Sequence, residues 1–437
     1  MLQCLTSQAQ IPKTEDFPEY TADIAEREGP PSHSHQVINV MDFGAVADGR
    51  SHPLKEVAGS QEEIDQKYGS GHYTLEDERD FVAIMEAIRA AKRSGQYGAD
   101  IKAVRYANAV RLPAGVYMVN RTIPMTDTYG GSIEGDGRLQ TIIRFNKEAP
   151  LFFITRCSFL TFEKFAIESN ISSKSIGFLF HEANTEKDPK YLGKVTFNMV
   201  FDSMMMTRLY KAVQITGNVM TDSMTFSKVR FLQCLTAFHL QNPQGLNYQF
   251  LSCNFEVHGD ESTFAPFKES DVVCFNIQAG GDITVIGGNI IHAGITLLLE
   301  PDAAFAPNGQ GPSISWGSGI FNFYGVRWEQ IGGAQPTLFE SRGSERFSAR
   351  INFDSCMIYQ RVAALGKPVG FLRPGMNVTF RNSVFNNGVV EEVIGGRVGK
   401  ARPALILDNT SGLTFKRVSG DVPEKLRAYF ETRGPQD

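Results

Sequence analysis

The sequence has no long apolar run, no basic cluster and no closely spaced cysteines, and each absence excludes a class of protein. No stretch approaches the roughly 18 consecutive apolar residues that indicate a membrane-spanning helix. A formal net charge of −5 without a basic run argues against binding of nucleic acid. The six cysteines lack the close spacing of a zinc site. Met1–Gln10 lacks the basic start and apolar core of a signal peptide.

What the sequence does contain is a short repeat. Its pattern is a polar residue, an apolar one, two free positions, a small or apolar residue, one free position and a large apolar residue. The segments begin at Thr161, Thr196, Thr225, Gln249, Thr284, Asn322, Asn352 and Thr379, at intervals of roughly 24 to 38 residues. Units of this size cannot bury their own apolar faces, so they must stack. The repeat therefore predicts an all-β fold, a single-stranded parallel β-helix, with Cys253 and Cys356 as buried free thiols in its core.

The organisation along the chain predicts one folded domain behind a polar arm. Residues 1–36 are polar and aperiodic, which predicts an extended or disordered arm, and the β-helix domain covers 37–437. Residues 50–73 are predicted to be a loop. One amphipathic helix is predicted at about 75–93, capped by Thr74 and covering the open N-terminal end of the solenoid, with the coils at about 109–420.

Three segments near the N-terminus, with the helix between them, resemble the start of the pectate-lyase-like superfamily, the glycosyl hydrolase family 28-related group. They are Asp42–Gly49, Arg111–Tyr117 and Ile133–Gly137. The resemblance implies a right-handed parallel β-helix that binds or cleaves polysaccharide. It also implies a secreted, cell-surface or virion-associated location and, by analogy with phage tailspikes, a homotrimer.

The catalytic signatures of that superfamily are absent. The Asn-Thr-Asp, Asp-Asp, Gly-His-Gly and Arg-Ile-Lys motifs of its polygalacturonases do not occur, and neither do the pectate lyase signatures. No catalytic residue can therefore be assigned by motif.

The repeat itself predicts which side chains share a face, because outward positions in adjacent coils stack about 4.8 Å apart. The predicted substrate-binding residues on this face are Arg230, Asn254, Asn289, Arg327, Tyr359 and Arg361. Glu256 and Glu329 fall two coils apart in one column, a separation of roughly 9 to 10 Å between backbones. That lies near the upper end of the range for the two carboxylates of inverting glycosidases. The pair therefore predicts a glycoside hydrolase, or else two solvated glutamates paired with arginines.

Two further residues are candidate catalytic groups. Asp202 falls where the repeat expects a large apolar residue, which indicates either a functional aspartate or a local bulge. His258 lies among carboxylates, where it could act as a general base, and the same cluster could hold Ca²⁺; no other cofactor or metal is expected. A polar loop is the alternative for this cluster.

Two other functions remain open from the sequence. Tyr359 and Arg361 could serve a polysaccharide lyase, in which arginine stabilises the charge that develops beside a uronate carboxyl group. A non-catalytic phage fibre or adhesin that only binds glycan has the same fold. We expect an enzyme that cleaves an extracellular or capsular polysaccharide. We expect neither nucleic acid nor a membrane as its partner.

Overall fold

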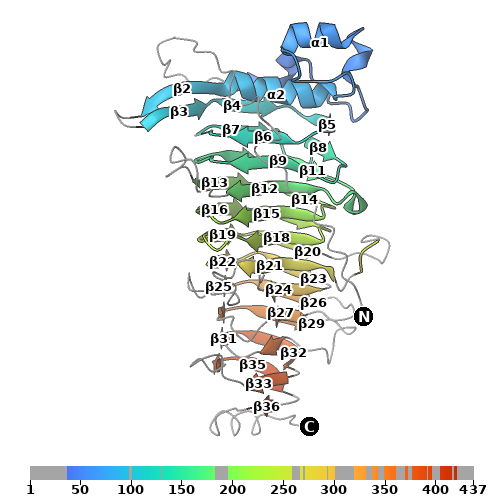
Figure 1. Ribbon diagram of the computed structural model, residues 1–437. Helices are drawn as coiled ribbons and strands as arrows, with labels where there is room; N and C mark the ends of the chain where they lie inside the picture. The colour runs from blue at the N-terminus through green and yellow to red at the C-terminus, as the bar shows by residue number, and fades with distance from the viewer. Residues whose placement is uncertain are drawn as a thin grey trace, which may run out of the picture.

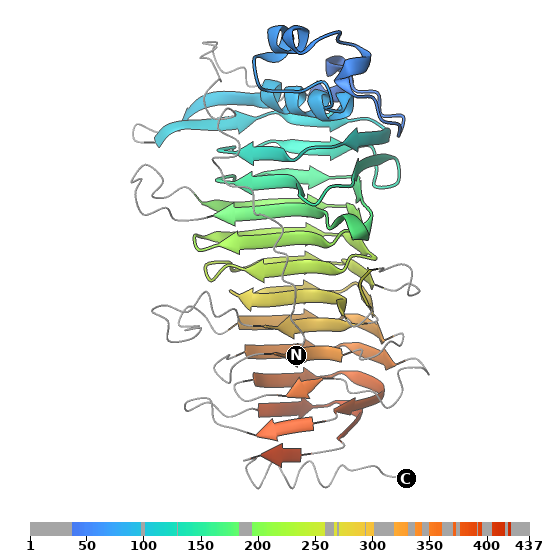
Figure 2. The same ribbon diagram turned by 45° about the vertical axis from the view of Figure 1, so that its right-hand side comes forward.

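The computed structural model describes residues 37–97, 101–128, 130–182, 195–257, 266–268, 271–292, 294–300, 319–330, 337–342, 349–360, 370–372, 376–390, 392–395, 404–415 and 418–420. Three long, entirely parallel sheets, named A, B and C in chain order, enclose one core. Over most of the chain each coil adds one strand to each sheet, so the fold is a right-handed parallel β-helix, as predicted. Figures 1 and 2 show the coils stacked in a single column.

The strands of the three sheets have the following bounds. Sheet A contains β1 (Val37–Asn39), β4 (Ala109–Leu112), β7 (Ser132–Gly135), β10 (Thr161–Glu163), β13 (Thr196–Asp202), β16 (Thr221–Ser227), β19 (Tyr248–Leu251), β22 (Ile283–Ile286), β25 (Gly319–Tyr324), β28 (Ala349–Asp354), β31 (Met376–Arg381) and β34 (Ala404–Asp408). Sheet B contains β5 (Gly115–Val119), β8 (Thr141–Phe145), β11 (Ala166–Glu168), β14 (Met205–Thr207), β17 (Arg230–Leu232), β20 (Asn254–Val257), β23 (Asn289–His292), β26 (Arg327–Gln330), β29 (Met357–Gln360), β32 (Val384–Val390) and β35 (Ser411–Phe415). Sheet C contains β6 (Ile123–Thr126), β9 (Pro150–Thr155), β12 (Ile176–Glu182), β15 (Lys211–Gly217), β18 (Thr236–Gln241), β21 (Val273–Ala279), β24 (Ile295–Leu299) and β27 (Thr337–Ser341).

The remaining elements lie at the two ends of the solenoid, apart from one short helix. At the N-terminal end are η3 (Val40–Phe43), η4 (Leu54–Glu56), α1 (Gln61–Tyr68), α2 (Arg79–Ala91) and the antiparallel hairpin of β2 (Lys92–Tyr97) and β3 (Ile101–Ala107). A small parallel sheet of β30 (Phe371–Leu372), β33 (Glu392–Gly395) and β36 (Val418–Gly420) lies near the C-terminal end. The short helix η5 (Ile171–Ser173) lies between β11 and β12. No helix in the described ranges is long and apolar enough to cross a membrane.

The sequence repeat marks the corner between sheets A and B. In the coil that begins at Thr225, Phe226 points into the core from β16, Lys228 turns the chain with φ +53°, and Phe231 points inward from β17. The backbone N–H of Lys228 donates to the carbonyl of Leu251 in the next coil at 2.8 Å. The hydrogen-bond ladder thus continues around the corner. The same position has positive φ in Lys164, Ser203, Ser252, Gly287, Gly325, Ser355, Asn382 and Asn409.

Stacked aromatic rings fill the core. Phe201, Phe226 and Phe250 lie at equivalent positions of three coils, with ring centroids 4.6 and 4.7 Å apart and planes within 8° of parallel. Trp328 is fully buried in the same core. The five cysteines in the described ranges, Cys253 and Cys356 included, are buried and free, which confirms their prediction as core thiols.

The helical region departs from the prediction at its edges. The helix α2 begins at Arg79 and ends at Ala91, and Glu78 rather than Thr74 precedes it. The Thr74 N–H instead donates to Asp77 Oδ2 at 2.7 Å, which closes a turn before the helix. The predicted loop contains α1, which the apolar pattern could not reveal because only Ile64 of that helix is buried.

The helix α2 packs against the first coil. Its apolar stripe belongs to the main core, and it contacts η3, β1, β4 and β5. The Asp80 carboxylate accepts three backbone N–H groups, from Val46 at 2.6 Å, Ala47 at 3.1 Å and Met118 at 2.8 Å. That this helix protects the end of the solenoid stays a prediction.

Candidate functional site

The strand register aligns the predicted outward columns of sheet B. Arg230, Asn254, Asn289 and Arg327 are paired from β17 to β26, and Asn289 Nδ2 donates to Asn254 Oδ1 at 3.3 Å. The neighbouring column runs from Glu256 through Ile291 and Glu329 to Tyr359. The structure therefore brings these predicted residues onto one face, while their catalytic and binding roles stay predictions.

Each glutamate of this column contacts an arginine. Glu256 forms an ion pair with Arg230, and Glu329 forms one with Arg327 at 2.6 Å. Both carboxylate side chains are only 15% exposed. The two glutamates lie two strand spacings apart, roughly 9 to 10 Å, with Ile291 between them.

Asp202 does not interrupt the apolar column, so the predicted start of the repeat in that coil, Thr196, was wrong. Phe201, not Phe197, pairs with Phe162 and Phe226 in the core column, and the repeat there runs from Val200 to Met206. Asp202 is the outward residue that follows Phe201, and Ser203 Oγ donates to its carboxylate at 2.8 Å. The sequence misled because Thr196-Phe197 copies the polar-apolar start of the repeat four residues too early.

Two predicted site residues, His258 and Arg361, lie outside the described residues. The same holds for the loop in which Ca²⁺ was considered. Within the described ranges no group of three or more His, Cys, Asp or Glu side chains could hold a metal ion.

Sheet C carries a group of polar side chains that the sequence analysis missed. Gln214, His239 and Asn276 occupy paired outward positions on β15, β18 and β21, and Lys211 is the first residue of β15. With Gln278, which follows on β21, these residues form what we call the sheet C polar cluster. Apolar outward clusters flank it on both sides, Phe153, Ile176 and Leu179 toward the N-terminal end and Val273, Ile295 and Leu298 toward the C-terminal end.

Burial sets this cluster apart from ordinary surface residues. His239 alternates with the inward Phe238 and Leu240, yet it is only 6% exposed. Its Nε2 lies 3.3 Å from Gln278 Oε1, whereas neither its Nδ1 nor Asn276 Oδ1 has a hydrogen-bond partner in the part of the chain that the structure describes. Burial, with the nearby Lys211 ammonium, lowers the pKa of His239 well below its ordinary value, so the imidazole is neutral.

Lys211 has no anionic partner among the described residues. Its ammonium lies 5.7 Å from the centre of the Tyr210 ring, and no described carboxylate lies within ion-pair distance of it. Burial lowers its pKa to about 8. The Tyr210 ring in turn contacts Phe267, with ring centroids 5.4 Å apart. Strongly perturbed titratable groups that lie together are a physical marker of functional sites.

The sequence could have revealed this cluster only through the alternation in sheet C. In Lys211–Gly217 and Thr236–Gln241 a polar residue, Gln214 or His239, lies between two apolar residues that point into the core. The repeat used for the prediction covers only the corner between sheets A and B. That repeat does not extend to the third strand of each coil.

Glu182 is a buried carboxylate with a structural explanation. It lies at the end of β12 and accepts hydrogen bonds from the Arg156 N–H and from the hydroxyls of Thr155 and Thr196. Burial raises its pKa to about 7, against the effect of these donors. Because its donors join consecutive coils, we assign it to the stability of this corner.

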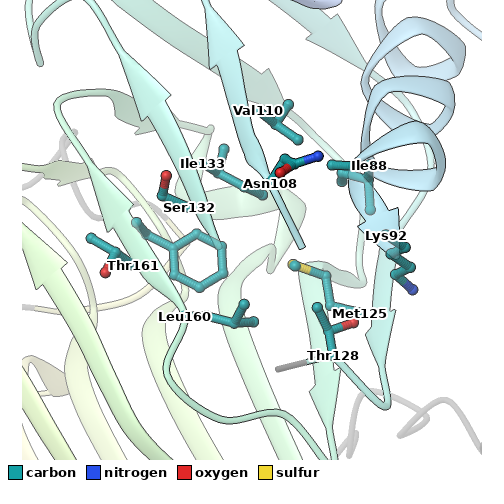
Figure 3. Close-up of a pocket in the computed structure, with 12 residues that line it drawn as sticks. Ile88, Lys92, Asn108, Val110, Met125, Thr128, Ser132, Ile133, Leu160 and Thr161 are labelled. Atoms are coloured by element: carbon teal, nitrogen blue, oxygen red, sulfur yellow. The ribbon is translucent and has the colours of Figure 1, made fainter. Parts of the chain in front are cut away.

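A cavity at the N-terminal end is too small for a ligand. It lies between the end of α2 and the first coils, lined by Ile88, Val110, Met125 and Ile133 among others (Figure 3). Its volume of about 10 Å³ holds at most one water molecule.

Comparison with known proteins finds likeness in structure alone. No family model and no curated protein matches the sequence. The A-module of the mannuronan C-5 epimerase AlgE4 of Azotobacter vinelandii is 13% identical, with a TM-score of 0.49, over 89% of this chain and 100% of that module. The tailspike gp42 of Acinetobacter phage vb_AbaP_AS12 is 8% identical, with a TM-score of 0.46, over 88% of this chain and 63% of the tailspike. ORF18 of Geobacillus virus E2 is 13% identical, with a TM-score of 0.42, over 88% of this chain and 62% of that chain.

Proposed function

We propose that the protein binds a polysaccharide along the outward face of sheet C, at the sheet C polar cluster. The observation that carries this proposal is a pair of buried polar atoms, His239 Nδ1 and Asn276 Oδ1, that have no hydrogen-bond partner among the described residues. Buried polar groups are hydrogen-bonded in the great majority of cases. A ligand that supplies the missing partners would repay the cost of burying these atoms.

A chain of sugars matches the shape and chemistry of the cluster. Gln214, His239 and Asn276 repeat along the solenoid axis at the strand spacing, about 4.8 Å. A ligand lying along this axis meets one polar side chain per coil. Sugar hydroxyls both donate and accept hydrogen bonds, so they can satisfy an imidazole nitrogen and an amide oxygen alike. The rings of Tyr210 and Phe267 add an apolar surface beside the cluster.

The experiment is calorimetric titration of the purified protein with a panel of neutral and acidic polysaccharides. We expect saturable binding to at least one polymer and at least a tenfold loss of affinity in Asn276→Leu. Asn377, a half-buried outward residue of β31 on sheet A, offers the control Asn377→Leu, which should bind like the wild type. Binding that survives Asn276→Leu unchanged, or no binding to any polymer, would overturn the proposal.

Hydrolysis is a second candidate function, and the register of sheet B favours it. Glu256 and Glu329 share one outward column at a separation that leaves room for a sugar and a water molecule. In this reaction one carboxyl group protonates the leaving glycosidic oxygen while the other takes a proton from the attacking water. New reducing ends without absorbance near 235 nm would support hydrolysis. A matching rise in absorbance would indicate β-elimination instead.

We also propose a cellular location and an oligomeric state for the protein. A glycan-binding β-helix fits a secreted, cell-surface or virion-associated protein. A homotrimer is proposed from the resemblance alone, and light scattering of the purified protein tests it.

A further inference from the structure

Lys211 is the one cation of the sheet C polar cluster. It pairs with Ile176 on β12 and with Thr236 on β18, so its neighbours across the strands are apolar or neutral. The uncharged amides of Gln214 and Asn276 and the neutral imidazole of His239 lie on the same face of sheet C. Within the described part of the chain, nothing in the cluster neutralises the ammonium.

The carboxylate that continues this column of sheet C already forms an ion pair with an arginine. Glu340 on β27 continues the column of Gln214, His239 and Asn276, two strand spacings beyond Asn276. Its Oε1 accepts a hydrogen bond from Arg342 Nε at 2.6 Å. The described cluster therefore carries a net positive charge.

A partly buried ammonium without a counter-ion is costly, because a charge withdrawn from water needs a paired charge or several hydrogen bonds. An anionic group on the ligand would supply both. The amides and the imidazole would then bind the uncharged hydroxyls of the same chain. This arrangement discriminates against neutral sugars, which would leave the ammonium unpaired.

We infer that the polysaccharide bound at sheet C is acidic, and that Lys211 pairs with its carboxylate or sulfate groups. This inference rests on the proposed function and names the ligand class of the same site. Lys211 is a binding residue in this account, since its ammonium contacts the ligand.

The test compares each acidic polymer with its own neutral form. A uronate polymer is titrated beside the same polymer after carboxyl reduction, and a sulfated polymer beside its desulfated form. We expect at least tenfold tighter binding of the acidic member in one of these pairs. The pair that shows the difference identifies the anionic group of the ligand as a carboxylate or a sulfate.

Two lysine variants show whether Lys211 is responsible. Lys211→Met keeps the length of the side chain and removes the charge, so the preference for the acidic member should disappear. The matched control is Lys67→Met on α1, an exposed lysine whose ammonium also lies near a tyrosine ring, 4.7 Å from the centre of Tyr68. This control should keep the preference.

The outcomes separate this inference from the proposed function. If acidic and neutral members bind equally and Asn276→Leu weakens both, the polysaccharide site stands and the acidic ligand class is wrong. A preference that survives in Lys211→Met overturns the role of Lys211. Absence of binding to every polymer overturns the site and this inference together.

Discussion

Glu256 and Glu329 lie in the same outward column of sheet B with one residue between them, and each forms an ion pair with an arginine. If they are the acid and base of a hydrolase, Glu256→Gln and Glu329→Gln should each lower the rate of reducing-end release at least 100-fold. Stability should change by at most about 1 kcal/mol, because partly exposed ion pairs contribute little.

The chain offers a matched control for this prediction. Glu168 lies in the same column of sheet B and pairs with Arg144 at 2.7 Å, but it is three strands before Glu256. Glu168→Gln should leave the rate unchanged. If Glu256→Gln and Glu329→Gln behave like this control, the pair is structural.

Asp80 tests whether α2 protects the open end of the solenoid. Its carboxylate accepts three backbone N–H groups from two other segments, and Asp80→Ala would leave these donors unsatisfied. We expect a loss of at least about 2 kcal/mol in the free energy of unfolding. Hydrogen exchange should rise first in β4, β5 and β6.

A loss of protection spread evenly over all coils would contradict that local role for α2. The control is Asp65→Ala on α1, whose carboxylate accepts hydrogen bonds from the nearby side chains of Gln61 and Ser70. It should not change exchange in β4–β6.

The corner between sheets A and B predicts opposite effects for two substitutions at equivalent positions. Gly325 has φ +60°, and an added Cβ would meet no atom within 4 Å, so Gly325→Ala should cost only the backbone strain of about 1 kcal/mol. Ser252, with φ +52°, already bears that strain, so Ser252→Gly should stabilise slightly or be neutral. Chemical denaturation measures both. Equal effects of the same sign would show that these corners do not set stability through backbone conformation.

Glu182 predicts a pH dependence of stability. Its pKa in the folded protein is about 7, above the ordinary 4.5, so the folded state binds a proton more tightly than the unfolded state. The stabilisation is fully present below pH 4.5 and is lost as the pH rises through about 7, by about 3 kcal/mol at most. Glu182→Gln removes this contribution and should flatten that part of the stability curve.

Subtracting the free energy of unfolding of Glu182→Gln from that of the wild type at each pH isolates the contribution of this residue from that of other carboxylates. This difference should fall between pH 4.5 and 7 and be constant above pH 8. A flat difference, or one that rises with pH, would contradict the burial of an uncharged Glu182.

The sequence predicted the fold because one repeat coincides with one physical unit, the corner between sheets A and B. The inward Phe226 and Phe231 and the turn at Lys228 must recur in every coil, so the pattern is visible. It also placed Glu256 and Glu329 in one column. The predicted position of the repeat was wrong around Asp202, because a second polar-apolar pair, Thr196-Phe197, precedes the true one.

The sheet C polar cluster could not be predicted in the same way. Strands of sheet C follow connections of variable length, so no fixed spacing links Gln214 to His239 or Asn276 in the sequence. Their outward positions become equivalent only through the register of β15, β18 and β21. Their burial and missing partners are properties of the folded chain and leave no mark in the sequence.

The most direct test of the account is the measurement of stability and polysaccharide binding together in His239→Leu. Leucine fills a similar volume and removes a buried nitrogen that has no partner, so the free energy of unfolding should stay within about 1 kcal/mol of the wild type or rise. Affinity should fall at least tenfold, while His52→Asn, at a half-buried site near the N-terminal end, should bind normally. A large loss of stability with unchanged affinity would contradict the account, because it would make His239 a structural residue of sheet C.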